Sequence, residues 1–239
     1  CNVFLREACY CVARSPHVID LEFTELGEHV HPEQLRAKLQ AAIDAADASG
    51  RDYDAVLLLF GLCGNAGVGL RAGQTPLVIP RAHDCCTILL GSKHAFREHF
   101  GDNPSTPFSS AGYMERGEYF LRVEDGQSKV HYGDGYAEMV AKYGAENAAY
   151  IWEQMHPAGH GEDHRAVFID IPEMRHLGYE EQFRVKAEGE GREVVTLPGS
   201  LRLIAALIGG DWNAADFLVV PPGHTTQGVY DFEEIIRAQ

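Results

Sequence analysis

The stretch TPLVIPRAHDCCTILLGS, residues 75–92, organises the rest of the chain. Its apolar run Leu77–Ile79 predicts a buried strand that ends at Pro80. A cation, an imidazole, a carboxylate and two thiols then follow in close succession, as Arg81, His83, Asp84, Cys85 and Cys86. In open α/β sheets, ligands bind at the carboxyl ends of the strands. The stretch therefore predicts one wall of an active site or a metal site.

The composition argues against several classes of partner. The chain has 239 residues, of which 45% are hydrophobic, and a formal net charge of −15. Binding to nucleic acid requires clustered Lys and Arg, and so does docking on anionic lipid. No apolar run approaches the roughly 20 residues that cross a bilayer. We expect a cytoplasmic protein with a small-molecule substrate and no nucleic-acid or membrane partner.

Strand and helix patterns alternate along the chain, which predicts an α/β fold. The run AVLLLF, within a predicted strand at 54–60, is typical of a strand buried on both faces of a parallel sheet. Other strands are predicted at residues 18–25, 77–79, 167–171, 193–197 and 217–220. Helices are predicted at residues 2–14, 32–49, 93–100, 134–155, 173–187 and 200–208, with a short one after the Gly-rich turn at 61–69.

These elements predict one domain over residues 1–239 with a doubly wound, Rossmann-like and mostly parallel sheet. Helices are expected on both faces of this sheet. An aromatic-rich insertion at about residues 101–131, with a strand-like piece at 118–123, is expected to fold over the sheet as a lid. We also expect a first strand to end just before Cys1.

Three of the six cysteines fall at equivalent places in this pattern. Cys1 precedes the first predicted helix, Cys63 follows the AVLLLF run and Cys85 follows the strand at 77–79. Because adjacent strands lie about 4.8 Å apart, thiols at their carboxyl ends can meet at one edge of the sheet. Thiolates favoured by nearby helix N-termini bind zinc or an iron–sulfur cluster. We predict that Cys1, Cys63 and Cys85 bind a metal, with His83 as a fourth ligand or a base.

The alternative for each cysteine is burial as a small apolar residue. That alternative is favoured for Cys86, and for at least one of Cys9 and Cys11, which do not share a helix face. A lasting disulfide framework is the weaker explanation in a chain of this size without a secretory signal.

Other residues of the predicted site have acid–base or binding chemistry. Glu7, His83 and Asp84 are candidates for proton transfer. Arg81 is predicted to bind a substrate carboxylate, and Asn65 to donate a hydrogen bond. The Gly-rich turn GLCGNAGVG, residues 61–69, matches neither nucleotide-binding motif, so we interpret it as a tight turn close to the group that Cys63 holds.

Five segments resemble an uncharacterised family, domain of unknown function 1638: VFLREACY, YDAVLLLFGLCGN, PLVIPRAHDCCTILLGS, YGAENAAY and FLVVPPG. The resemblance covers nearly the whole chain. The family's characteristic residues fall on Cys1, Glu7, Cys63, Asn65, Arg81, His83, Asp84, Cys85 and Glu115. The chain departs from the family at Tyr113, where a Trp is usual, and in a shorter segment before the YDAVLLL strand.

The resemblance implies a prokaryotic protein of anaerobic one-carbon metabolism, beside corrinoid proteins and methyltransferases. It implies no established reaction, and it alone makes Glu115 a candidate for substrate binding. Because the segment around Tyr113 departs from the family, the role of the insertion stays open.

Our leading hypothesis is a metal-thiolate enzyme in which zinc, held by the three cysteines, serves thiol or methyl transfer. The His83-x-Cys85 pair with a distant cysteine is analogous to the ligands of zinc thiol-alkyltransferases, on a different fold. The first alternative is a [4Fe-4S] enzyme that acts as a Lewis acid on a small carboxylated substrate. The others are a non-catalytic metal-binding accessory protein or metallochaperone, and a metal-free binder of small anions.

Overall fold

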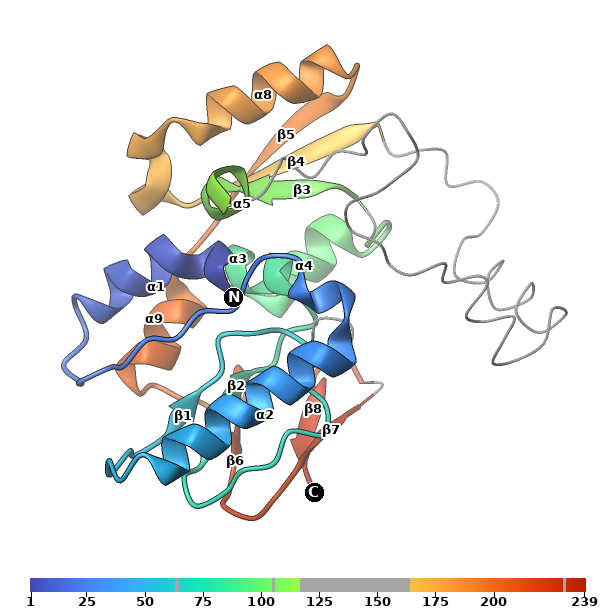
Figure 1. Ribbon diagram of the computed structural model, residues 1–239. Coiled ribbons are helices and arrows are strands. Elements are labelled where there is room, and N and C mark those ends of the chain that lie inside the picture. The colour runs from blue at the N-terminus through green and yellow to red at the C-terminus, as the bar shows by residue number, and fades with distance from the viewer. Residues whose placement is uncertain (63–64, 105, 117–163, 230) are drawn as a thin grey trace, which may run out of the picture.

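The computed structural model describes residues 1–62, 65–104, 106–116, 164–229 and 231–239, which form a mixed α/β fold (Figure 1). The described strands fall into two three-stranded sheets and one hairpin. The mixed sheet has the order β1-β2-β6, with strands Val56–Leu57, Leu77–Pro80 and Phe217–Val220. The parallel sheet has the order β3-β4-β5, with strands Phe108–Ser110, Arg165–Asp170 and Glu193–Pro198. The hairpin pairs β7, Thr226–Gly228, with β8, Ile236–Ala238.

Helices cover both faces of the mixed sheet. β1 runs parallel to β2, and β6 pairs antiparallel with β2. Helix α2, Pro32–Ala48, packs Leu35, Leu39 and Ile43 against Leu77 and Ile79 of β2. Helix α9, Arg202–Gly209, packs Leu203 and Leu207 against Val78 on the opposite face. Because successive side chains of a strand point to opposite faces, the continuous apolar run of β2 has a covering helix on each side.

The parallel sheet has two differently covered faces. Helix α8, Tyr179–Gly189, packs Phe183 and Ala187 against Ala166 and Phe168 of β4. Val167 and Ile169, on the other face of β4, belong to the largest apolar cluster of the protein. That cluster also contains buried residues of α1, Leu5–Val12, and α3, Cys85–Leu90. These helices lie between the two sheets in Figure 1, so one core is shared by both.

Five further elements complete the described chain. Two short 3-10 helices, η1 at Asn2–Phe4 and η2 at Glu28–Val30, precede α1 and α2 respectively. A third 3-10 helix, η3, spans Pro172–Leu177 and precedes α8. Helices α4, Lys93–Phe100, and α5, Ala111–Arg116, flank β3.

Several predicted elements are confirmed. The first predicted helix is η1 followed by α1, and the second is α2. Helix α4 begins after Ser92, whose Oγ accepts hydrogen bonds from the backbone amides of His94 and Ala95. The predicted strands at 77–79, 167–171, 193–197 and 217–220 correspond to β2, β4, β5 and β6.

Other predictions were wrong. Residues 18–25 form no strand, and Val18 is 97% exposed. No helix lies within the described residues 65–76. The predicted helix at 173–187 is divided at Gly178, which has a left-handed φ of 70° that ends η3 before α8 begins. Residues 108–116 of the predicted insertion form β3 and α5. They do not fold over the sheet, because β3 pairs with β4 and is the edge strand of the parallel sheet.

The described strands do not form the single sheet that the sequence pattern predicts. They are divided between a mixed and an all-parallel sheet, so the doubly wound arrangement stays a prediction. The predicted elements at 118–123 and 134–155 lie outside the described residues, as does any lid that they form.

Candidate functional site

The residues just before two predicted metal ligands, Cys63 and Cys85, meet where β1 and β2 end. The Leu62 amide donates a hydrogen bond to the Ala82 carbonyl, with 2.9 Å between nitrogen and oxygen. A Cβ atom on Gly61 would lie 2.6 Å from the backbone nitrogen of Asp84, so only glycine fits there. The loop after β1 therefore lies directly against the start of α3. The segment that leads to Cys63 is thus in contact with the segment that leads to Cys85.

Two of the three predicted metal ligands are among the described residues. Cys85 is the first residue of α3 and is 9% exposed. Cys1 is partly buried and packs against two apolar clusters, one that contains Cys85 and one that contacts Leu62. Cys63 lies outside the described residues. Residues 1–62, 65–104, 106–116, 164–229 and 231–239 contain no group of three His, Cys, Asp or Glu side chains placed to hold a metal ion, so a set completed by Cys63 stays a prediction.

The remaining cysteines fit the apolar alternative in part. Cys86 has no exposed surface, and burial raises the pKa of its thiol. Burial also raises the pKa of Cys11, to about 11. Both thiols are protonated at neutral pH, and a protonated thiol is a poor metal ligand. Cys9 is exposed on α1 and does not share the burial of Cys11.

Glu7 is the most unusual acid of the described chain. Its side chain has no exposed surface, and neither carboxylate oxygen hydrogen-bonds another described residue. Burial raises the pKa of this carboxyl from 4.5 to about 7. Glu7 lies one helical turn from both Val3 and Cys11, which belong to the core cluster between the two sheets. A carboxyl group of this kind holds a proton near neutral pH and can exchange it, as a general acid requires.

A second buried oxygen lies on the sheet face that borders this cluster. The Ser110 hydroxyl, at the carboxyl end of β3, has no exposed surface and no hydrogen-bond partner among the described residues. Ser110 pairs in register with Ile169, so both side chains point toward the core cluster that contains α1. The α1 side of the parallel sheet therefore buries more than one polar group that has no hydrogen-bond partner among the described residues.

Two predicted site residues, Asp84 and Arg81, form hydrogen bonds that give each of them a structural role. Asp84 is the N-cap of α3, and its Oδ1 accepts hydrogen bonds from the Thr87 amide and hydroxyl at 2.9 and 3.1 Å. Arg81 donates to the backbone carbonyls of Ala214 at 2.9 Å, of Glu234 at 2.6 Å and of Ile236. These contacts tie the end of β2 to the C-terminal hairpin, so the predicted binding of a substrate carboxylate by Arg81 has no structural support.

His83 lies beside a cavity of about 570 Å³. The side chain is half-buried, and burial lowers the pKa of its imidazole while the neighbouring Asp84 opposes that shift. A neutral imidazole at neutral pH can accept a proton or bind a metal through nitrogen. Asn65, which adopts a left-handed φ of 71°, also lines the cavity. The structure thus brings together His83, Asn65 and the segment next to Cys63.

Glu115 lies apart from this cavity. Its carboxylate accepts hydrogen bonds from Arg6 Nε at 2.8 and 2.9 Å and from Arg6 Nη2 at 2.5 Å. This bidentate pair lowers the pKa of Glu115. The pair joins α1 to α5, which accounts for Glu115 as a structural residue and leaves its predicted role in substrate binding without support.

Sequence reasoning missed one wall of the cavity. Asp231 and Phe232 line it from the segment between β7 and β8, where the sequence suggests only a polar tail. The ring centroids of Phe232 and His83 are 6.1 Å apart. The available signal was Phe232 itself, a large aromatic residue between the acidic residues Asp231 and Glu233, because an aromatic side chain usually packs against another part of the protein.

Comparison with known proteins identifies a family. No helix among the described residues is long and apolar enough to cross a membrane. No curated protein and no solved structure matches the chain. The sequence matches the family described as Protein of unknown function (DUF1638) over residues 23–208, well over half of its length, and the chain belongs to that family.

Proposed function

We propose that the protein is a metal-thiolate enzyme whose metal is held by Cys1, Cys63 and Cys85. The observation that carries this proposal is the contact between the loop after β1 and the start of α3. The residues just before Cys63 contact Ala82 and Asp84, and Cys1 packs against the clusters on both sides. Because Cys63 follows Leu62 directly in the chain, we propose that it brings a third thiol to the same end of the mixed sheet, where ligands bind in α/β folds.

The donor set suits a soft metal ion. Thiolate sulfur is a preferred ligand of zinc, and His83 is close enough in the chain to Cys85 to complete or support the set. With three protein ligands, zinc leaves one position open for water or a substrate thiol. The neutral His83 imidazole is suited to accept a proton, and the protonated Glu7 carboxyl is suited to donate one.

The resemblance noted in the sequence supplies the metabolic setting of the proposal. It favours thiol or methyl transfer in anaerobic one-carbon metabolism, with a corrinoid protein or methyltransferase as partner, in the cytoplasm. Asp84 caps α3 and is therefore proposed to position the loop rather than to transfer protons. On the scale of the fold, we propose that β1, β2 and α2 represent one half of a doubly wound arrangement, since β1 and β2 are parallel and α9 covers their other face.

Metal analysis of protein purified without oxygen tests the proposal. We expect about one zinc ion per chain, because the three cysteines form a single site. Cys1→Ser, Cys63→Ser and Cys85→Ser are each expected to lose the metal. The matched control is Cys9→Ser, because Cys9 is exposed on α1 and does not belong to the proposed set.

The metal content and absorption of the same samples distinguish the zinc enzyme from the alternative functions. A brown protein that contains iron and absorbs at about 400 nm would replace zinc with a [4Fe-4S] cluster on the same cysteines. Protein that binds metal without turning over thiol substrates, and co-purifies with a corrinoid protein, would be an accessory protein or metallochaperone. Metal-free protein with an unchanged fold in Cys63→Ser would contradict the proposal.

A further inference from the structure

The cavity beside His83 has two walls of different origin. The first consists of Leu62, Asn65, Val68 and His83, on the loops that follow β1 and β2. The second consists of Gly228, Val229, Asp231 and Phe232, on the segment between β7 and β8. The second wall lies beyond residue 208, where the match to the family ends. It is therefore the part of the site in which this chain's own selectivity can reside.

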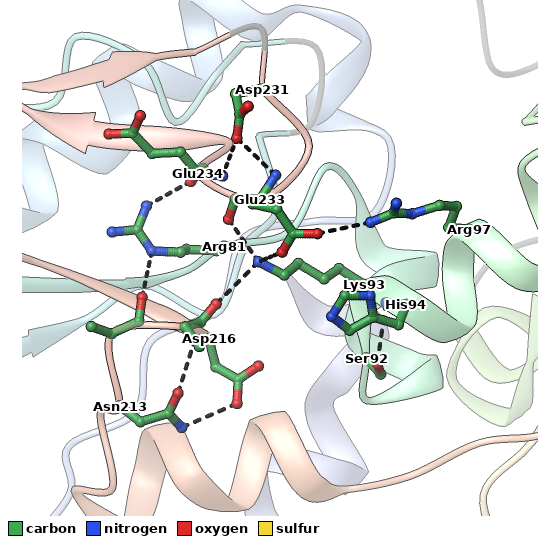
Figure 2. Close-up of polar contacts among 12 residues, drawn as sticks. Arg81, Ser92, Lys93, His94, Arg97, Asn213, Asp216, Asp231, Glu233 and Glu234 are labelled. Atoms are coloured by element: carbon green, nitrogen blue, oxygen red, sulfur yellow. Dashed lines mark hydrogen bonds and ion pairs between the residues drawn. The ribbon is translucent and has the colours of Figure 1, made fainter.

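Three cations hold this second wall in place, as Figure 2 shows. Lys93, only 8% exposed, donates to the Glu233 carbonyl at 2.6 Å and pairs with its carboxylate at 2.9 Å. Arg97 pairs with the same carboxylate at 2.9 Å and stacks 3.6 Å above the Phe232 ring. Arg81 donates to the carbonyls of Glu234 and Ile236. All three cations are thus engaged by residues 232–236, and none of them is among the residues that line the cavity.

The charged side chains that line the cavity do not match those of an anion-binding site. No Lys or Arg is among the described lining residues, and Asp231 is the single carboxylate there. Asp231 Oδ1 accepts hydrogen bonds from the amides of Glu233 and Glu234 at 2.9 and 2.8 Å, which fixes the carboxylate at the cavity edge. Among the other described residues that line the cavity, most side chains are apolar, and the polar groups are those of Asn65 and His83.

We infer that this cavity binds a small neutral or cationic molecule with an apolar body, and that it excludes anions. The apolar body lies against Phe232, Val68 and Val229, and its positive or hydrogen-bonding end is recognised by Asp231, His83 or Asn65. As a statement about substrate, this inference rests on the proposed function, in which the metal site lies next to the cavity. In the proposed metal site, three thiolates around a divalent ion would carry a net charge of −1, which would repel an anion further. The alternative of a small carboxylated substrate bound by Arg81 is therefore disfavoured.

Three probes of matched size test the inference: benzylamine, benzyl alcohol and benzoate. Their binding is followed by NMR of the ring resonances of His83 and Phe232, which are assigned with His83→Gln and Phe232→Leu. We expect benzylamine and benzyl alcohol to perturb both rings, each with a Kd at least about tenfold below that of benzoate. A benzoate Kd within about tenfold of either one, or no binding by any probe, would overturn the inference.

Asp231→Asn supplies the charge test without loss of the cap, since an Asn side-chain oxygen accepts the same two hydrogen bonds. We expect this variant to bind benzylamine more weakly than the wild type does and to retain benzyl alcohol binding. Glu188→Gln, an exposed charge removal on α8, is the control and changes neither Kd. Unchanged benzylamine binding in Asp231→Asn would show that Asp231 does not recognise the cation.

Metal content is measured on the same samples, so the two proposals fail separately. Metal-free protein with the expected probe preference would refute the metal-thiolate enzyme and leave the cavity assignment intact. Metal-loaded protein that binds benzoate as tightly as benzylamine would refute the cavity assignment and leave the metal-thiolate enzyme intact.

Discussion

Glu7 is buried in the core between the two sheets, and its carboxylate oxygens have no partner among the described residues. Removing a charged carboxylate from water without a compensating hydrogen bond is costly, so the neutral form is favoured in the folded protein. This raises the pKa of Glu7 to about 7. The unfolded chain, in contrast, has a carboxyl of ordinary pKa.

The stability of the protein therefore depends on pH through Glu7. Because the folded state holds the proton more tightly, the contribution of Glu7 to the free energy of unfolding is largest below pH 4.5, decreases as pH rises through 7 and then levels off. The loss amounts to about 3 kcal/mol across this range. Urea unfolding at a series of pH values should show this decrease, and Glu7→Gln should remove it.

Other groups titrate in the same pH range, so the difference between the wild type and the variant is the quantity to compare. The exposed acid Glu188, changed to Gln, serves as the control and should leave the pH dependence in place. If Glu7→Gln followed the wild-type curve at every pH, burial of the carboxyl would not be the cause.

Asp84 is explained by its position at the start of α3, where its Oδ1 satisfies the Thr87 amide. Asp84→Ala should lower the free energy of unfolding by about 1 kcal/mol, the usual value for loss of an N-cap. Asp84→Asn should be nearly as stable as the wild type, because Asn caps as well as Asp does. Thermal or urea unfolding measures both.

Metal content distinguishes capping from proton transfer at the same residue. A pure cap predicts that Asp84→Asn keeps both the metal and any activity of the enzyme. If Asp84→Asn kept its stability and metal but lost activity, the carboxylate would have a chemical role in addition to the cap.

Short helices depend on close contacts at their ends, and α3 is an example. It has only six residues, and every one of them is buried. The loop after β1 approaches its first turn so closely that Gly61 has no room for a side chain. The cap at Asp84 and the glycine at position 61 therefore place α3 against the loop that leads to Cys63.

Gly61→Ala tests this contact. The added methyl group would lie 2.6 Å from the Asp84 backbone nitrogen, so the loop and the helix must separate. We expect a loss of about 1–3 kcal/mol in the free energy of unfolding, as for overpacking in a core, together with loss of the proposed metal. Urea unfolding and metal analysis provide the two measurements.

Gly189→Ala is the matched control for this substitution. A Cβ at Gly189 meets nothing within 4 Å, so the change should be neutral or slightly stabilising. Full metal content in a destabilised Gly61→Ala protein would mean that the contact supports the fold and not the proposed site.

On the scale of the whole molecule, the two sheets share one core. The cluster between them contains Cys85 and Ile88 of α3 together with Val167 and Ile169 of β4. Helix α1 packs on α9, which in turn covers the mixed sheet. The pair Arg6–Glu115 adds a polar link between α1 and α5. A shared core of this kind predicts that the sheets unfold together.

Equilibrium unfolding in urea tests whether the predicted single domain is cooperative. Trp212 packs in the cluster next to β2 and β6, so its fluorescence reports on the mixed sheet, whereas far-ultraviolet circular dichroism reports on the whole chain. In a Trp152→Phe background, the two transitions should coincide. Separate midpoints would mean two domains, one for each sheet.

The sequence predicted local structure well because local structure follows from local chemistry. The 3.6-residue period of Leu35, Leu39 and Ile43 predicted α2, and the cap at Ser92 predicted the start of α4. The apolar runs predicted β2 and β4. Residues 18–25 show the limit: they have the alternation of a strand, but no strand among the described residues pairs with them.

The candidate site was predicted in part for the same reason. The polar cluster after β2 was visible in the sequence, and the structure places His83 at a cavity. The sequence could not show that Arg81 is engaged by backbone carbonyls from residues 214, 234 and 236, because those contacts join segments more than 130 residues apart. Phe232 was missed for this reason as well.

The sequence by itself therefore determined where helices and strands begin, which faces are apolar and which residues carry chemistry, since these depend on neighbours along the chain. Tertiary structure alone decided that the strands divide into a mixed and a parallel sheet, that burial makes Glu7 a weak acid, and that the C-terminal hairpin closes the cavity at His83. Strand pairing, desolvation and cavity walls are made by residues far apart in the sequence, and only their positions in space bring those effects about.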